Sequence, residues 1–124
     1  MRKIRIIIAL VLALCMVLSF TALAADSGYT GVVTIVHTND VHSNVDVEPY
    51  VKGYVDALRK EGKNVVLVSA GDAFKGTAFA DLTDGLDVAT VMNMTGYEIF
   101  AMGNHEQMLG IERFKKIVEK AQFP

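Results

Sequence analysis

The sequence predicts an α/β fold in which three parallel strands alternate with three helices. Three apolar runs, the first of them rich in β-branched residues, predict strands that begin near Val32, Val65 and Ile99. A helical pattern of apolar residues follows each run, so the expected element order is βαβαβα. Because right-handed crossovers align such strands in one direction, we expect a parallel sheet. Ligands of open sheets of this kind gather at the carboxyl ends of the strands.

The three helices are predicted from the spacing of apolar residues and from the residues that interrupt it. After Pro49, apolar side chains recur one helical turn apart, at Val51, Tyr54, Val55 and Leu58. Pro49 suits the first turn of this helix, and Gly62 is expected to end it. Asp84 is the expected cap of a second helix that ends at Gly96. An apolar stripe over residues 111–121 predicts the third helix.

The first 25 residues have the pattern of a secretory signal peptide. Basic residues come first, at Arg2, Lys3 and Arg5, and an uncharged run over residues 6–20 follows them. Ala22-Leu23-Ala24 then matches a cleavage site, so residues 26–124 are expected to form the domain of an exported protein, in the periplasm, the cell wall or the medium. The alternative is a retained membrane anchor, although the run is shorter than the about 20 residues that a span needs.

The composition of residues 26–124 limits which partners the domain can bind and which bonds can stabilise it. The only cysteine, Cys15, lies in the signal segment, so no disulfide is available to the domain. Residues 26–124 carry nine basic and 14 acidic residues, a net charge of −5. They show no basic stripe, which argues against nucleic acid and anionic membrane surfaces as main partners. About 100 residues suffice for one small domain but are few for a closed metal site between covered sheet faces, so we expect an incomplete domain.

Side chains able to bind metal follow each of the three predicted strands. Asp40 and His42 follow the first strand, Asp72 the second, and Asn104 and His105 the third. Asp40 and Asp72 are 32 residues apart, as are Asp72 and Asn104, which is about the length of one strand–helix repeat. Consecutive parallel strands would therefore bring all five residues to one edge of the sheet. On an extended segment, Asp40 and His42 would also point to the same side.

Each of these residues also has an ordinary structural explanation. An aspartate after a glycine often caps a turn, Gly103-Asn104 reads equally as a plain turn, and His105 as a surface histidine. Their joint placement after three successive strands favours a metal site instead. Mixed Asp, His and Asn ligands suit Mn²⁺, Fe²⁺ or Zn²⁺. Two such ions can turn water into hydroxide and neutralise the charge of a phosphate, while His105 could protonate the leaving oxygen.

Four segments are distinctive in combination: HTNDVHS, SAGDAFKGTAFADLTDG, VMNMTGYE and AMGNHE. Together they closely resemble the 5′-nucleotidase branch of the calcineurin-like metallophosphoesterases, from about Val32 to Pro124. The resemblance implies that residues 26–124 are the N-terminal part of a catalytic domain whose complete fold is a four-layer α/β/β/α sandwich. His37 matches a family position that is not a metal ligand, which implies a histidine of the core or one that supports the site indirectly.

The resemblance also implies a role for each candidate site residue. Asp40 and His42 would bind one metal, Asp72 would bridge two metals, and Asn104 would bind the second. His105 would be the catalytic residue. The implied cofactors are two divalent ions, drawn from Mn, Zn, Fe, Co and Mg. The residues that contact the substrate are not identified.

The implied activity is that of an exported, metal-dependent phosphoester hydrolase acting on nucleotides. It would be of the 5′-nucleotidase, 2′,3′-cyclic nucleotide phosphodiesterase or nucleoside-diphosphate-sugar hydrolase type, in nucleotide catabolism and phosphate salvage. The nucleotide or another small phosphoester is the implied partner, and a membrane is contacted only through the signal segment.

The sequence departs from the family pattern in ways that keep other interpretations open. Gln107 and Met108 stand where the family usually has phenylalanine and aspartate, and that aspartate pairs with the catalytic histidine. The later histidines and the C-terminal domain that binds the base in the family are absent from the sequence. The alternatives are a truncated, non-catalytic remnant that binds a divalent metal weakly or not at all, and a signal-anchored envelope protein with an interaction role.

Overall fold

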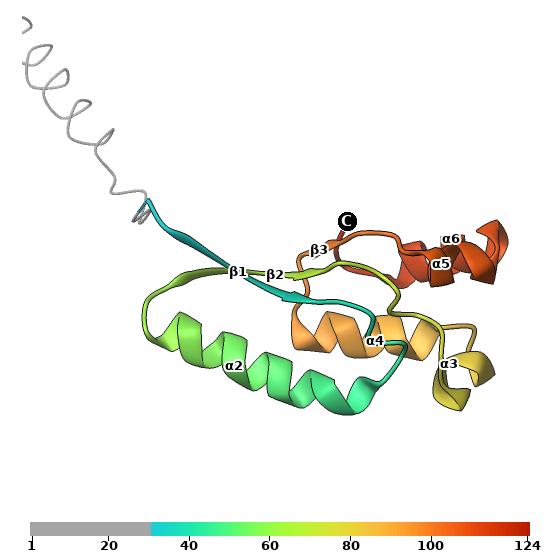
Figure 1. The fold of residues 1–124 in the computed structure, drawn as a ribbon, viewed down its shortest axis with the longest axis horizontal. Helices are drawn as coiled ribbons and strands as arrows, with labels where there is room; N and C mark the ends of the chain where they lie inside the picture. The colour runs from blue at the N-terminus through green and yellow to red at the C-terminus, as the bar shows by residue number, and fades with distance from the viewer. Residues whose placement is uncertain (1–30) are drawn as a thin grey trace, which may run out of the picture. The chain divides into compact units, whose positions relative to one another are not determined.

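The computed structural model describes residues 31–124, which form a three-stranded parallel sheet and its helices (Figure 1). The strands are β1 (Val33–Thr38), β2 (Asn64–Ser69) and β3 (Ile99–Phe100), with β2 in the middle. The two long strands pair in parallel along their whole length, and β3 pairs only with the end of β2. The predicted α/β class and its parallel sheet are confirmed. The predicted signal peptide lies outside the described residues.

The described helices include the three that the sequence predicts and three short ones that it does not. They are the 3₁₀ helix η1 (Val45–Val47) and the α-helices α2 (Glu48–Lys60), α3 (Ala78–Leu82), α4 (Leu86–Thr95), α5 (Asn104–Leu109) and α6 (Ile111–Lys120). Pro49 lies in the first turn of α2, and left-handed glycines follow α2 at Gly62 and α4 at Gly96, as predicted. The short helices α3 and α5 have five and six residues, too few to give a periodic pattern.

The expected cap of α4 at Asp84 is wrong. The N-cap is Gly85, which has a φ of 81°, and the Asp84 side chain pairs with Arg113 at 3.3 Å instead. A Cβ at Gly85 would lie 2.9 Å from Ile117 Cδ1 and 3.1 Å from the Phe74 carbonyl oxygen. The close packing of α6 and the loop after β2 therefore requires a glycine at the start of α4.

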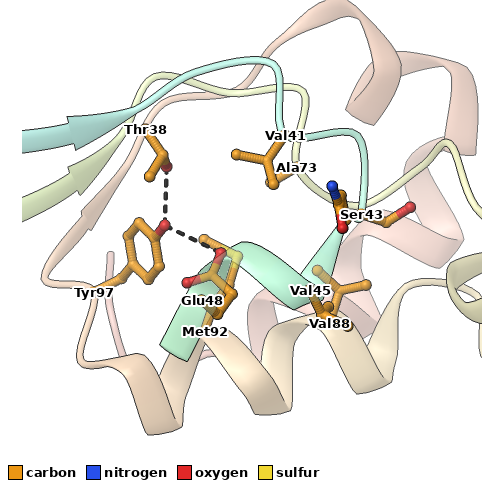
Figure 2. A pocket seen from close by; sticks show the side chains of 10 residues that line it. Thr38, Val41, Ser43, Val45, Glu48, Ala73, Val88, Met92 and Tyr97 are labelled. Carbon is orange, nitrogen blue, oxygen red and sulfur yellow. Dashed lines mark hydrogen bonds between the residues drawn. The ribbon is translucent and has the colours of Figure 1, made fainter. Parts of the chain in front are cut away.

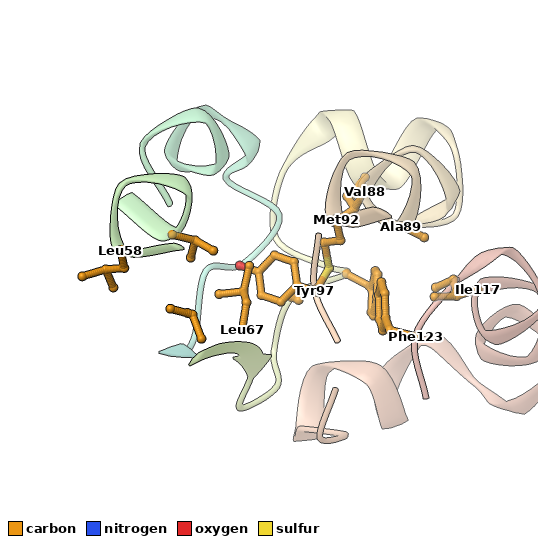
Figure 3. Close-up of a cluster of buried hydrophobic side chains, with 13 residues drawn as sticks. Leu58, Leu67, Val88, Ala89, Met92, Tyr97, Ile117 and Phe123 are labelled. Carbon is orange, nitrogen blue, oxygen red and sulfur yellow. The ribbon is translucent and has the colours of Figure 1, made fainter. Parts of the chain in front are cut away.

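The hydrophobic core lies between one face of the sheet and the helices α2 and α4, which are on the same side of the strands (Figure 1). Alternate residues of β2 are buried, so Val65, Leu67 and Ser69 face these helices. Figure 3 shows Leu67 and Tyr97 between Leu58 of α2 and Met92 of α4. The core continues to Ile117 and Phe123, so residues from every part of the described chain meet in it.

The opposite face of the sheet is open, although the continuous apolar run over residues 65–69 is typical of a parallel strand buried on both faces. Its side chains include Ile35, which is 66% exposed, and Ile99, which is 49% exposed. His37 is also exposed and shares the Ile35 face of β1, so it does not lie in the core of the described residues. The other alternative, a histidine that supports the site indirectly, stays a prediction. The second sheet that the resemblance implies is not among residues 31–124, so within these residues the face has no cover. Within the same residues, no helix is long and apolar enough to cross a bilayer.

A buried polar network joins α2 to the end of β1. Tyr97 donates a hydrogen bond to Glu48 Oε1 at 3.2 Å and accepts one from Thr38 Oγ1 at 2.9 Å (Figure 2). These residues line a cavity of about 10 Å³, and the second oxygen of Glu48 is buried without a hydrogen-bond partner among the described residues. Burial raises the pKa of the Glu48 carboxyl above its ordinary value of 4.5, and the Tyr97 hydrogen bond offsets only part of this. Burial likewise raises the pKa of Tyr97.

We expect Glu48 to make the folded state less stable as the pH rises. The pKa of Glu48 is higher in the folded state than in the unfolded state. Its contribution to the unfolding free energy is therefore complete below the unfolded pKa and is lost as the pH rises through the folded pKa. Glu48→Gln stays neutral at every pH, so its unfolding free energy should rise relative to that of wild type as the pH rises above the ordinary pKa of 4.5. Urea denaturation at a series of pH values measures this difference, and Glu112→Gln at an exposed residue is the matched control. A difference independent of pH would contradict the assignment.

Candidate metal centre

The loops that follow the three strands lie side by side at the carboxyl edge of the sheet. The Asp40 N–H donates to the Gly71 carbonyl at 3.2 Å, and the His42 N–H donates to the Asp72 carbonyl at 2.9 Å. The Ala101 N–H donates to the Ser69 carbonyl at 2.9 Å. These bonds continue the parallel pairing past the ends of the strands, so each loop has a fixed position relative to the next.

Three candidate site residues have left-handed backbone conformations. The φ angles are 52° at Asp40, 49° at His42 and 55° at Asp72. Such conformations are uncommon for residues other than glycine and cost free energy, so they persist only where the surroundings hold them. The sequence predicted that Asp40 and His42 point to the same side because their segment is extended. The segment is not extended, so this reason was wrong. Their side chains do meet, with His42 Nε2 lying 3.7 Å from Asp40 Oδ1.

His42, Asp72 and His105 converge on one point. Each offers a ligand atom, and these atoms all lie within 4.8 Å of one another. The two imidazole rings are edge to face, with centroids 4.3 Å apart and an interplanar angle of 75°. Asp72 is buried, and its Oδ1 accepts a hydrogen bond from the backbone N–H of His105 at 2.8 Å. The cluster draws one residue from the loop after each strand, as the spacing of the sequence predicts.

Two predicted ligands lie at the margin of this cluster. Asp40 adjoins it through His42. Asn104 is the first residue of α5, and its side chain is exposed. No hydrogen bond within residues 31–124 joins the Asn104 amide to the other four candidates, so its role as a ligand stays a prediction.

The donor set of the cluster fits a divalent metal ion. Two imidazole nitrogens and a carboxylate are ligands that borderline divalent ions accept. In addition, His105 Nδ1 is buried and has no hydrogen-bond partner in the part of the chain that the structure describes. A buried polar atom without a partner is costly, which points to a group that would complete it. Met108, three residues after His105 on α5, is 65% exposed and offers no partner.

The sequence-based prediction missed residues that hold the loops together. Glu106 is 1% exposed, and its carboxylate accepts hydrogen bonds from backbone N–H groups of two loops. A glutamate two residues after the first residue of a helix is a capping signal, and this could have identified it. Ser43 is buried and bonds to Thr77, with the Thr77 N–H donating to Ser43 Oγ at 2.8 Å. Gly76 lies against His42, where a Cβ would come within 2.6 Å of the His42 carbonyl oxygen.

Comparison with known proteins decides the family. The model of the calcineurin-like phosphoesterase family matches residues 33–123. The chain belongs to the calcineurin-like phosphoesterase family. It is 36% identical over 110 residues to a 5′-nucleotidase of Rattus norvegicus, an alignment that covers 74% of this chain and 19% of that protein. It is 35% identical over 117 residues to protein UshA of Escherichia coli, covering 86% of this chain and 21% of UshA.

Solved structures of the same family support this assignment. The NAD nucleotidase NadN of Haemophilus influenzae matches with a TM-score of 0.69 and 31% identity, over 74% of this chain and 20% of that one. A 5′-nucleotidase precursor of Thermus thermophilus matches with a TM-score of 0.65 and 28% identity, over 73% and 21% of the two chains. The chain thus spans about a fifth of the length of these relatives, and the predicted resemblance to the 5′-nucleotidase branch is confirmed.

We expect the contact between the loops after β2 and β3 to tolerate no side chain at Gly103. A Cβ there would overlap Asp72 Oδ1 and lie 2.7 Å from the Asp72 backbone nitrogen. Gly103→Ala should therefore lower the unfolding free energy by about 1–3 kcal/mol. Gly53→Ala is the matched control, because a Cβ at this helical position meets nothing within 4 Å. That control should raise the unfolding free energy by up to about 1 kcal/mol. Urea denaturation measures both, and equal stability of Gly103→Ala and wild type would contradict the contact.

Proposed function

We propose that the chain is part of an exported, metal-dependent phosphoester hydrolase that acts on nucleotides. The observation that carries the proposal is the convergence of ligand atoms of His42, Asp72 and His105 within 4.8 Å of one another. His42 and Asp72 have left-handed backbones, and His105 lies in the first turn of α5. Family membership supports the reaction class, and the relatives named 5′-nucleotidase support a nucleotide as substrate. The pattern of residues 1–25 supports export. The net negative charge of residues 26–124 supports a small phosphoester rather than a nucleic acid.

Five residues have proposed roles in this reaction. Asp40, His42, Asp72 and Asn104 would hold two divalent ions, with Asp72 shared between them. Bound divalent ions supply activation of water and neutralisation of phosphate charge in hydrolases of this type. Buried Asp72 is suited to the shared position because its backbone and its Oδ1 are both held by hydrogen bonds. Its second carboxylate oxygen is left for a ligand.

His105 would act on the phosphoryl group or on the leaving oxygen. Its imidazole faces the same point as Asp72 and His42, so it could donate a proton to an oxygen there. In this chain no described group fixes the imidazole through Nδ1. The orientation of the His105 ring therefore lacks the support that a carboxylate would give. We expect a poorly positioned proton donor, and hence slow hydrolysis.

The test of the proposed function is metal-dependent phosphate release by the full chain. We expect slow release of phosphate from AMP with Mn²⁺ and none after chelation. Asp72→Asn should abolish the release, because it weakens the group shared by both ions. Asp46→Asn, a matched change at an exposed residue, should leave it unchanged. Release that is absent with Mn²⁺, or that survives in Asp72→Asn, would contradict the proposal and favour a non-catalytic protein.

A carboxylate at position 108 should raise the turnover of the same reaction. Residues three apart are neighbours on a helix, so Met108→Asp on α5 places a carboxylate near the unpartnered His105 Nδ1. We expect kcat to increase by about 10-fold, a part of the about 10²–10⁴-fold that a positioned acid supplies. Gln107→Asp adds the same charge on another face of α5 and is the control. An unchanged kcat in Met108→Asp would show that another group already orients His105.

A further inference from the structure

We infer that Glu106 is a positioning residue that sets the geometry of Asp72 and His105 in the candidate metal centre. The inference rests on the proposed function, because it concerns the same site. Glu106 follows His105 directly and is 1% exposed. It touches neither the point on which the cluster converges nor the solvent, so it acts through the residues that do.

The Glu106 carboxylate binds four backbone N–H groups from two loops. Oε2 accepts from Asp72 at 2.9 Å and from Gly103 at 2.8 Å. Oε1 accepts from Ala73 at 2.8 Å and from Phe74 at 3.0 Å. One side chain thus orders three consecutive residues of the loop after β2 and the residue that precedes α5. Each oxygen uses both of its lone pairs, and the buried carboxylate is fully satisfied.

These bonds close a reciprocal link between the two loops. Glu106, in the first turn of α5, accepts a hydrogen bond from the Asp72 N–H, and Asp72 Oδ1 accepts one from the backbone N–H of His105 at 2.8 Å. The backbone and the carboxylate of Asp72 are therefore both tied to α5. The loops can approach this closely because both sides are glycine: a Cβ at Gly71 would lie 2.7 Å from the Gly103 nitrogen. A shift of Glu106 would move Asp72 and His105 relative to each other.

Helix capping alone does not account for this arrangement. A glutamate at this position of a helix caps it by accepting only the N–H of the residue before the helix, which here is Gly103. The other three donors belong to the loop after β2, more than 30 residues earlier in the chain. They begin at Asp72, whose left-handed φ of 55° needs such support.

The variant Glu106→Gln tests whether the hydrogen bonds of the Glu106 carboxylate, and not only the volume of the side chain, set the geometry of the site. The amide keeps the shape of the side chain but replaces one acceptor oxygen with a donor. In either orientation, two of the four N–H groups then face an NH₂ group and lose their acceptor. Glu119→Gln makes the same chemical change at an exposed residue of α6 and is the matched control. Glu106→Asp keeps the carboxylate but is one methylene shorter, and so it serves as a second variant.

The first readout is the nuclear Overhauser effect between the His42 and His105 rings in the metal-free full chain. Ring centroids 4.3 Å apart predict a clear effect in wild type and in Glu119→Gln. We expect its loss in Glu106→Gln and in Glu106→Asp while circular dichroism shows a folded chain. Exposed His37 is the only other histidine and serves as an internal reference. The second readout is a titration with Co²⁺ alone, followed by visible absorption, where we expect the dissociation constant of Glu106→Gln to rise about 10–100-fold.

The outcomes distinguish this inference from the proposed function. Folded Glu106 variants that keep the ring contact and bind Co²⁺ like wild type would overturn the inference and leave the proposed function standing. Loss of the folded state in both variants would assign Glu106 to the fold rather than to the site, and would overturn it equally. A wild type that shows the ring contact but does not hydrolyse AMP would contradict the proposed function while the positioning role stands.

Discussion

The candidate site depends on the parallel pairing of β2 with a strand on each side. This pairing ends all three strands at one edge, and backbone bonds carry it into the loops beyond. The His42 N–H reaches the Asp72 carbonyl, and the Ala101 N–H reaches the Ser69 carbonyl, both at 2.9 Å. Residues some 30 positions apart in the chain are thereby placed within reach of one ion. A change of register by one residue would turn every one of these side chains to the other face.

Residues at this edge of the sheet have backbone conformations and close contacts that would be unfavourable elsewhere in a protein. Asp40, His42 and Asp72 have left-handed backbones, and glycines at 71 and 103 let two loops touch. Buried polar groups cross-link the loops, Glu106 on one side and the Ser43–Thr77 pair on the other. Strain of this kind is typical of functional sites and requires support from the surrounding structure. The contacts of the protein's own groups therefore support the positions of the candidate site residues.

The sequence predicted the elements whose signal is local and missed those set by tertiary packing. β2 and α2 followed from an apolar run and from apolar spacing, and Gly62 and Gly96 marked the helix ends. Asp84 was misassigned because the need for glycine at 85 arises from Ile117, which is distant in sequence. Neither burial of β2 on both faces nor a place for His37 in the core is found, because only one face is covered by the described residues. The convergence of His42, Asp72 and His105 was predictable from spacing, whereas the bonds of Glu106 to another loop were not.

The central claim is that three loops of this chain form a preorganised site for a divalent ion. Anomalous diffraction at the manganese absorption edge, from crystals of the full chain grown with Mn²⁺, tests it most directly. The account predicts an anomalous peak beside the His42 imidazole and the Asp72 carboxylate, with the backbone of the three loops unchanged by the ion. Manganese bound only elsewhere, or at this edge only after the loops have rearranged, would contradict it.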